Sequence, residues 1–238
     1  MFPPVVLLGG LGMHARALAK IAATLYPNSP AALHAHSLLD LVSPPRAHAR
    51  LAAAAFSSLA AFPGGAILHV TSGSAFFAVA SGLVGAPNVR GVVLDSIPFA
   101  RREHKLLRVL GVPSALATPL GGAVRALLTS PLIGATMAHT DAYFATLARA
   151  DTWKGRPVLV ATSADDVITP AADAREWAAA RKAAWGAAGQ LDVYEGTGKH
   201  ACMARDDAAT FSAAVREWAA RTGVGVGGAS GTGKGGQS

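Results

Sequence analysis

One stretch of the chain, residues 65–81, restricts the possible folds more than any other. It reads Gly-Ala-Ile-Leu-His-Val-Thr-Ser-Gly-Ser-Ala-Phe-Phe-Ala-Val-Ala-Ser. Residues 66–70 are a short apolar run of the kind that forms a buried strand. Small residues alone make up Ser72-Gly73-Ser74, and an apolar helix is predicted for residues 75–83. A strand, a tight turn and a helix in direct succession are typical of an α/β protein, and such a turn can expose a serine hydroxyl above the sheet.

The composition allows one well-packed domain and argues against some partners. The chain has 238 residues, of which 51% are hydrophobic and 15% charged, so it can bury a full core. Its net charge is +7, but the arginines are scattered over alanine-rich segments and aromatic residues make up only 6%. We therefore expect no nucleic-acid partner. A peripheral contact with an anionic lipid surface stays open as an alternative.

The sequence contains few signals that indicate a cellular compartment. Cys202 is the single cysteine, which excludes an internal disulfide and fits a reducing, intracellular compartment. The charge-free residues 51–89 are long enough for a membrane span, but Pro63-Gly64-Gly65 interrupt them. No charged region precedes the apolar residues 5–8, so we expect no secretory signal.

Periodicity predicts the rest of the fold. Besides residues 66–70, strands are expected at 5–8, 31–37, 89–94, 157–162 and 191–194, and helices at about 14–25, 47–61, 170–188 and 206–221. The fold class is therefore α/β, a three-layer sandwich with a mostly parallel sheet of about six strands. We expect one domain over residues 1–222, with a helical cap insertion at about 101–151. The glycine-rich residues 223–238 are expected to be a disordered tail.

Three polar residues follow predicted strands in a suggestive order. Ser72 is the candidate nucleophile, and Asp165 comes just after the fifth strand, with Asp166 as the second choice. His200 ends a glycine-rich loop after the last strand, a good position for a general base. Asp95, at the end of the fourth strand, is a further candidate, although a capping role fits it equally well.

These residues predict nucleophilic catalysis. Ser72 would take up the acyl group, His200 would act as base and then as acid, and Asp165 would orient His200. The oxyanion would be held by the backbone N–H of Gly73 and by one from Gly10 or Leu11, in a glycine-rich turn after the first strand. The competing interpretation of Ser72 is an ordinary helix cap.

Other sites fit the sequence less well. A nucleotide site at residues 9–12 would need a third glycine and an acidic residue at the end of the second strand, and both are missing. The tail segment 228–235 resembles a P-loop but lacks the Ser or Thr after its lysine. His34 and His36 share a strand face without an acidic or cysteine partner nearby, so we expect neither a metal nor a cofactor.

Several segments together resemble the transmembrane protein 53-like family, a domain of unknown function within the α/β-hydrolases. The resemblance covers about residues 5–218 and is carried by Leu-Leu-Gly-Gly-Leu-Gly at 7–12, His-Val-Thr-Ser-Gly-Ser at 69–74, Gly-Val-Val-Leu-Asp-Ser-Ile-Pro at 91–98, Ser-Ala-Asp-Asp-Val-Ile at 163–168 and His-Ala-Cys-Met-Ala-Arg at 200–205.

The chain departs from the family pattern at several of these positions. The family usually has Trp at position 10, an aromatic residue at 71, Ser-Asn-Gly-Gly at 72–75 and often a second His at 203. The resemblance implies an α/β-hydrolase sheet without the usual first strands and a Ser-Asp-His triad. For animal members it also implies association with the nuclear envelope.

The sequence therefore predicts a serine hydrolase that cleaves an ester or similar acyl bond, with a small acyl or lipid-like substrate. The alternative is a catalytically silent member of the fold that acts as a membrane-associated interaction module through Arg101, Arg102, Lys105 and Arg108. Either protein would be cytoplasmic or peripherally bound to a membrane, with an organelle not excluded. The sequence leaves the oligomeric state and the identity of the substrate open.

Overall fold

A computed structural model describes residues 2–37, 44–100, 134–149, 151–153, 155–186 and 190–224. In these residues a central parallel sheet contains six strands: β1 (Val5–Leu11), β2 (Ala31–His36), β3 (Ala66–Thr71), β4 (Val89–Asp95), β5 (Val158–Ser163) and β6 (Leu191–Gly196). Their order is β2-β1-β3-β4-β5-β6. The six strands that periodicity predicts are all present, and the α/β three-layer expectation is confirmed.

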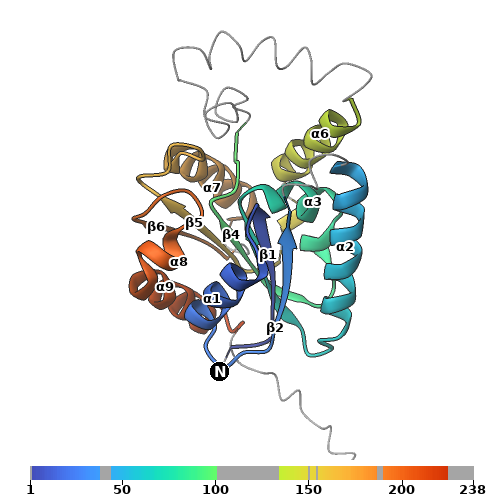
Figure 1. Ribbon diagram of the computed structural model, residues 1–238. Coiled ribbons are helices and arrows are strands. Elements are labelled where there is room, and N and C mark those ends of the chain that lie inside the picture. The colour runs from blue at the N-terminus through green and yellow to red at the C-terminus, as the bar shows by residue number, and fades with distance from the viewer. Residues whose placement is uncertain are drawn as a thin grey trace, which may run out of the picture.

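Helices cover both faces of the sheet (Figure 1). The described helices are α1 (Ala15–Leu25), α2 (Pro44–Ala60), α3 (Ala75–Ala80), α6 (Gly134–Ala148), α7 (Ala171–Trp185), α8 (Met203–Asp206) and α9 (Ala208–Arg221). Short 3-10 turns occur at η2 (Ser72–Ser74), η3 (Leu83–Gly85) and η4 (Asp151–Trp153).

Alternation along the strands divides the core into two parts. Val6 and Leu8 of β1 point to the cluster that contains residues of α2, α3, α6 and α7. Val5 and Leu7 point to the opposite cluster, beneath α1, α8 and α9. Successive side chains of a strand face opposite sides, so an apolar strand such as β1 serves both layers at once. Most strand side chains are buried, and this burial holds the carboxyl ends of the strands in fixed places.

The strand order reverses at β1. The chain runs from β1 outward to β2, then crosses back so that β3 pairs with the other side of β1. In a parallel sheet such a reversal leaves a crevice at the carboxyl ends of the two central strands, where ligands usually bind. Gly10 and Leu11 end β1, and Ser72 directly follows β3. The predicted nucleophile and the predicted oxyanion donors therefore meet at this position.

The cap prediction falls mostly outside the described residues. Of residues 101–151, the structure describes helix α6 and parts of its C-terminal flank. Tyr143 of α6 is buried and donates a hydrogen bond to the carbonyl of Pro98, at 2.5 Å, and its ring packs edge-on against Phe76 of α3. Arg101, Arg102, Lys105 and Arg108 and the tail from residue 225 also lie outside the described residues.

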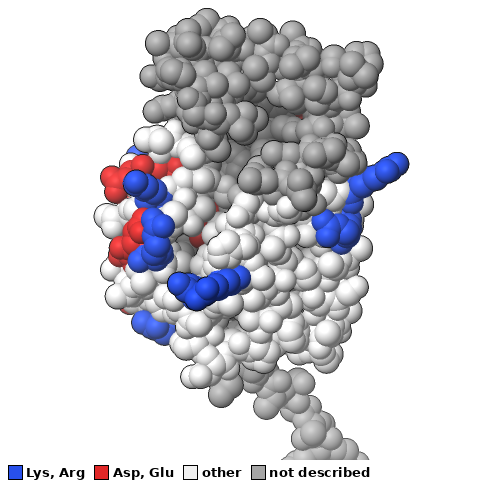
Figure 2. Space-filling view, viewed as in Figure 1, with Lys and Arg blue, Asp and Glu red and all other residues white. Residues whose placement is uncertain are grey.

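Charge is unevenly distributed over the face that Figure 2 shows. Acidic and basic side chains lie side by side near α8, whereas the charged side chains over α1 and α2 on this face are basic. Edge strand β6 carries two exposed ion pairs, one between Arg221 and Asp192 and one between Arg175 and Glu195. No helix in the described part of the chain is both long and apolar enough to cross a membrane.

Candidate active site

Ser72 lies on a strained turn between β3 and α3. Its φ is +51°, in the left-handed region that non-glycine residues rarely adopt, whereas Thr71 before it is still extended at φ −110°. The buried Ser74 braces this turn because its hydroxyl donates to the carbonyls of Leu8 and Thr71, at 3.1 and 2.8 Å. Positive φ at a serine turns its side chain away from the strand, and such strain concentrates at functional sites.

Gly10 makes room for this turn. A Cβ atom at position 10 would lie 2.9 Å from the Cβ of Ser72 and 3.3 Å from the carbonyl oxygen of Thr71. No side chain fits there, so the end of β1 can lie directly against the serine. The family resemblance gives Trp at this position, and the local packing in this chain leaves no space for it.

The backbone donors predicted for the oxyanion lie on both sides of Ser72. The Gly10 N–H contacts Sδ of Met13 at 3.1 Å, a weak acceptor that a substrate oxygen can replace. Gly73 follows the serine in the η2 turn, and a Cβ added there would have nothing within 4 Å. Leu11 is the last residue of β1, next to Gly10.

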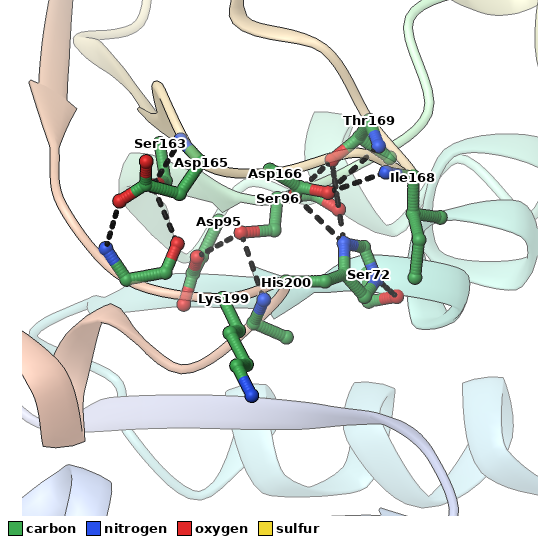
Figure 3. A network of polar contacts seen from close by, with 12 residues as sticks. Ser72, Asp95, Ser96, Ser163, Asp165, Asp166, Ile168, Thr169, Lys199 and His200 are labelled. Carbon is green, nitrogen blue, oxygen red and sulfur yellow. Dashed lines mark hydrogen bonds and ion pairs between the residues drawn. The ribbon is translucent and has the colours of Figure 1, made fainter.

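His200 connects the serine to a carboxylate (Figure 3). Its Nε2 lies 2.6 Å from the Oγ of Ser72, and its Nδ1 lies 2.8 Å from Oδ2 of Asp166. A carboxylate accepts hydrogen bonds, so the arrangement places the ring proton on Nδ1 and leaves the Nε2 lone pair to accept from the serine O–H. That is the tautomer a general base needs.

Asp166, and not Asp165, is the partner of His200. Asp165 is exposed, and its Oδ2 accepts from the Gly198 N–H at 3.3 Å. The sequence prediction prefers Asp165 as the acid, whereas the structure pairs His200 with the second choice, Asp166. The reason is a tight turn after β5, in which the Asp166 N–H bonds to the Ser163 carbonyl. This turn directs the second carboxylate toward the histidine and the first toward the loop before it.

The Asp166 carboxylate is well provided with donors. The N–H groups of Ile168 and Thr169 donate to Oδ1 at 2.8 and 2.9 Å, and the Thr169 hydroxyl donates to Oδ2 at 2.6 Å. Burial raises the pKa of this carboxyl, but the hydrogen bonds and charge of His200 together with the bonds from Thr169 outweigh it, so the pKa is lowered. The group is thus held ionised beside the imidazole.

Sequence reasoning missed the part played by Thr169. Its hydroxyl fixes Asp166 and also lies 3.4 Å from the Nδ1 of His200. A signal was present in Asp-Asp-Val-Ile-Thr, because an aspartate that accepts from the N–H groups two and three residues later is a common local turn. Of the other candidates, Asp95 is buried beside Ser96, next to the histidine loop. His34 and His36 lie on edge strand β2, where His34 contacts Ser58 and His36 packs edge-on against His48.

Comparison with known proteins identifies the fold of the chain. No protein-family model matches the chain, and no curated protein does. The transmembrane protein 53-like resemblance therefore stays a prediction. Among solved structures, an esterase of Pyrococcus furiosus is 12% identical with a TM-score of 0.59, over 92% of this chain and 81% of its own. A monoacylglycerol lipase of Paleococcus ferrophilus is 19% identical with a TM-score of 0.56, over 92% and 94%.

A third similar structure is an esterase of the fungus Rhizomucor miehei. It is 14% identical, with a TM-score of 0.60, over 92% of this chain and 73% of its own. At these identities the likeness concerns the backbone. The chain has the α/β-hydrolase fold, as the sequence predicts.

Proposed function

We propose that this chain is a serine hydrolase that cleaves an ester or similar acyl bond. The observation that supports this best is the contact of Ser72 Oγ with His200 Nε2 at 2.6 Å, made by a serine held at positive φ. A serine used only as a helix cap needs neither a histidine partner nor a strained backbone. The esterases and lipases among the similar structures agree with this chemistry.

The reaction follows from the positions of these groups. Ser72 Oγ attacks the carbonyl carbon of the ester while its proton passes to His200 Nε2, and Asp166 stabilises the imidazolium that forms. The negative oxygen of the tetrahedral intermediate accepts from the N–H of Gly73 and from that of Gly10 or Leu11. His200 then gives its proton to the leaving alcohol, which departs and leaves an acyl-serine.

The second half repeats these steps with water. His200 takes a proton from water, the hydroxide attacks the acyl carbon, and the proton returns to Ser72 as the carboxylic acid leaves. Every proton that is removed is returned, so the cycle restores the resting state of Ser72 and His200. A small acyl or lipid-like ester is the substrate class that we propose.

Labelling with a fluorophosphonate probe tests the proposal. The probe forms a bond only with an activated serine, so wild-type protein should be labelled and Ser72→Ala and His200→Ala should not. Hydrolysis of p-nitrophenyl esters with short and long acyl chains then separates a small acyl substrate from a lipid-like one. A folded wild-type protein that neither reacts with the probe nor hydrolyses either ester would refute the proposal.

A further inference from the structure

A second set of buried polar groups lies directly behind the histidine. Ala201, the residue after His200, has φ +54°, and its N–H donates to the Oγ of Ser96 at 3.2 Å. Ser96 directly follows β4, whereas Ser72 and Asp166 follow β3 and β5. The loop that carries the histidine is therefore attached to a strand end that lies between those of the nucleophile and the acid (Figure 3).

Ser96 is held tightly in place. It is 1% exposed, has φ +53°, and its N–H donates to the carbonyl of Ala161 in β5 at 2.9 Å. Its hydroxyl proton is directed to Asp95 Oδ1 at 2.9 Å, which leaves the oxygen lone pairs to accept from Ala201. Its carbonyl oxygen also lies 3.4 Å from the Thr169 hydroxyl, so one residue contacts both the histidine loop and the acid turn.

Asp95 makes this acceptor stronger. The carboxylate is 1% exposed, and its other oxygen faces Nε2 of the buried His69 at 3.5 Å, while the His69 Nδ1 pairs with the Tyr26 hydroxyl at 2.8 Å. A hydroxyl that donates to a buried carboxylate is polarised and accepts a further hydrogen bond more strongly. Burial, and then the negative charge of Asp95, raises the pKa of Tyr26.

Besides the bond that the buried Ser163 hydroxyl donates to the Gly198 carbonyl at 2.6 Å, three backbone N–H groups of the loop donate to aspartates closer to solvent. Thr197 N–H donates to Asp207, Gly198 N–H to Asp165, and Lys199 N–H to Asp206, at 3.2 to 3.3 Å. These bonds hold the part of the loop that precedes the histidine. Ser96 acts on the residue directly after it, and because the Ser96 side chain is buried, the accepting end of this bond is shielded from water.

From these contacts we infer that Ser96, supported by Asp95, is a positioning residue that sets the place of the His200 ring between Ser72 and Asp166. The inference rests on the proposed function, because the reaction it serves is the attack by Ser72. It assigns to Asp95 a different role from the capping or catalytic role that the sequence suggests. Asp95 acts through Ser96 and the loop backbone and has no contact with the reacting atoms.

Kinetics of three variants test the inference. Ser96→Ala removes the hydroxyl and keeps the Cβ, while Ser96→Gly removes the hydroxyl and suits the positive φ. Both should lower kcat for a p-nitrophenyl ester on the order of 10- to 100-fold with KM almost unchanged, as expected for a misplaced base. Ser212→Ala is the matched control, since it removes a buried hydroxyl of α9 that joins this helix to α1 by donating to the Thr24 carbonyl at 3.1 Å. It should keep the wild-type kcat.

Asp95 variants add a conservative comparison. Asp95→Asn keeps an oxygen that accepts from Ser96, so its kcat should be well above that of Asp95→Ala. Wild-type kcat in both Ser96 variants would overturn the inference, and so would an equal loss in Ser212→Ala. Because Ser96→Gly relieves the positive φ, it keeps the test available if Ser96→Ala does not fold.

Hydrogen exchange separates this inference from the proposed function. The Ala201 amide should be protected in the wild type and should exchange faster in both Ser96 variants, whether or not the protein hydrolyses esters. An inactive wild type with this exchange pattern would refute the proposed hydrolase function but support the hydrogen bond that attaches the loop to Ser96. An unprotected Ala201 amide in an active wild type would reject the attachment.

Discussion

Asp165 and Asp166 are neighbours in sequence, yet their carboxylates hold two different parts of one loop: Asp166 accepts from the His200 ring and Asp165 from the Gly198 N–H. The first contact orients the imidazole, and the second restrains only the backbone two residues before it. Loss of the negative charge should therefore affect turnover very differently at the two positions.

Replacing each aspartate by asparagine measures this difference. Asp166→Asn can present its amide N–H to Nδ1 and so favour the wrong tautomer, which should lower kcat on the order of 10³- to 10⁴-fold. Asp165→Asn keeps an oxygen for Gly198 and should lower kcat by no more than about tenfold. The measurement is kcat for a p-nitrophenyl ester, with circular dichroism as the control for folding. A larger loss at Asp165 would assign the acid to that residue instead.

The strained φ of Ser72 has a measurable cost. Ser72→Gly and Ser72→Ala both remove the hydroxyl, but only glycine adopts φ +51° without a Cβ clash. The free energy of unfolding of Ser72→Gly should therefore be about 0.5–1 kcal/mol higher than that of Ser72→Ala. This difference already allows for the extra freedom of glycine in the unfolded chain. Urea unfolding compares the two variants, and equal midpoints and slopes would show that the turn is relaxed.

Close packing at Gly10 predicts sensitivity to a single methyl group. Gly10→Ala places a Cβ 2.9 Å from that of Ser72, so β1 or the serine turn must shift, and kcat should fall on the order of 10- to 100-fold. Gly64→Ala is the control, because a Cβ at that exposed position has nothing within 4 Å. Normal turnover in Gly10→Ala would mean that the strand end moves away without disturbing the serine.

The lowered pKa of Asp166 makes part of the stability depend on pH. The folded protein binds this proton less readily than the unfolded chain, so the contribution is complete above the ordinary aspartate pKa of about 3.9 and disappears as the pH falls through the lower folded value. Wild type should therefore exceed Asp166→Asn in unfolding free energy by more at pH 6 than at pH 3. Urea titrations across this range check the sign, and a constant gap would contradict it.

Much of the fold could be predicted from local patterns. The four inner strands contain apolar runs that end in polar or glycine residues, and such runs mark buried parallel strands whatever their neighbours. Asp165 and Asp166 show a limit of prediction from local patterns. Both follow β5, and the choice between them depends on one turn bond, from the Asp166 N–H to Ser163.

Ser96 shows the same limit more clearly. Its contact with Ala201 joins residues 105 positions apart, and no periodicity in either segment predicts it. The cap predicted for residues 101–151 rests on segments without a strong period, and most of these residues lie outside the described part of the chain.

The contact between Ser72 and His200 joins two segments that are 128 positions apart. The histidine loop follows β6, the last strand of the sheet, so we expect the pair to form after the sheet has been assembled. Contacts of such sequence separation form late, because their loop closure must precede them. Reactivity of Ser72 would therefore report the end of folding, and during refolding or synthesis it would appear after the secondary structure and the collapse of the core.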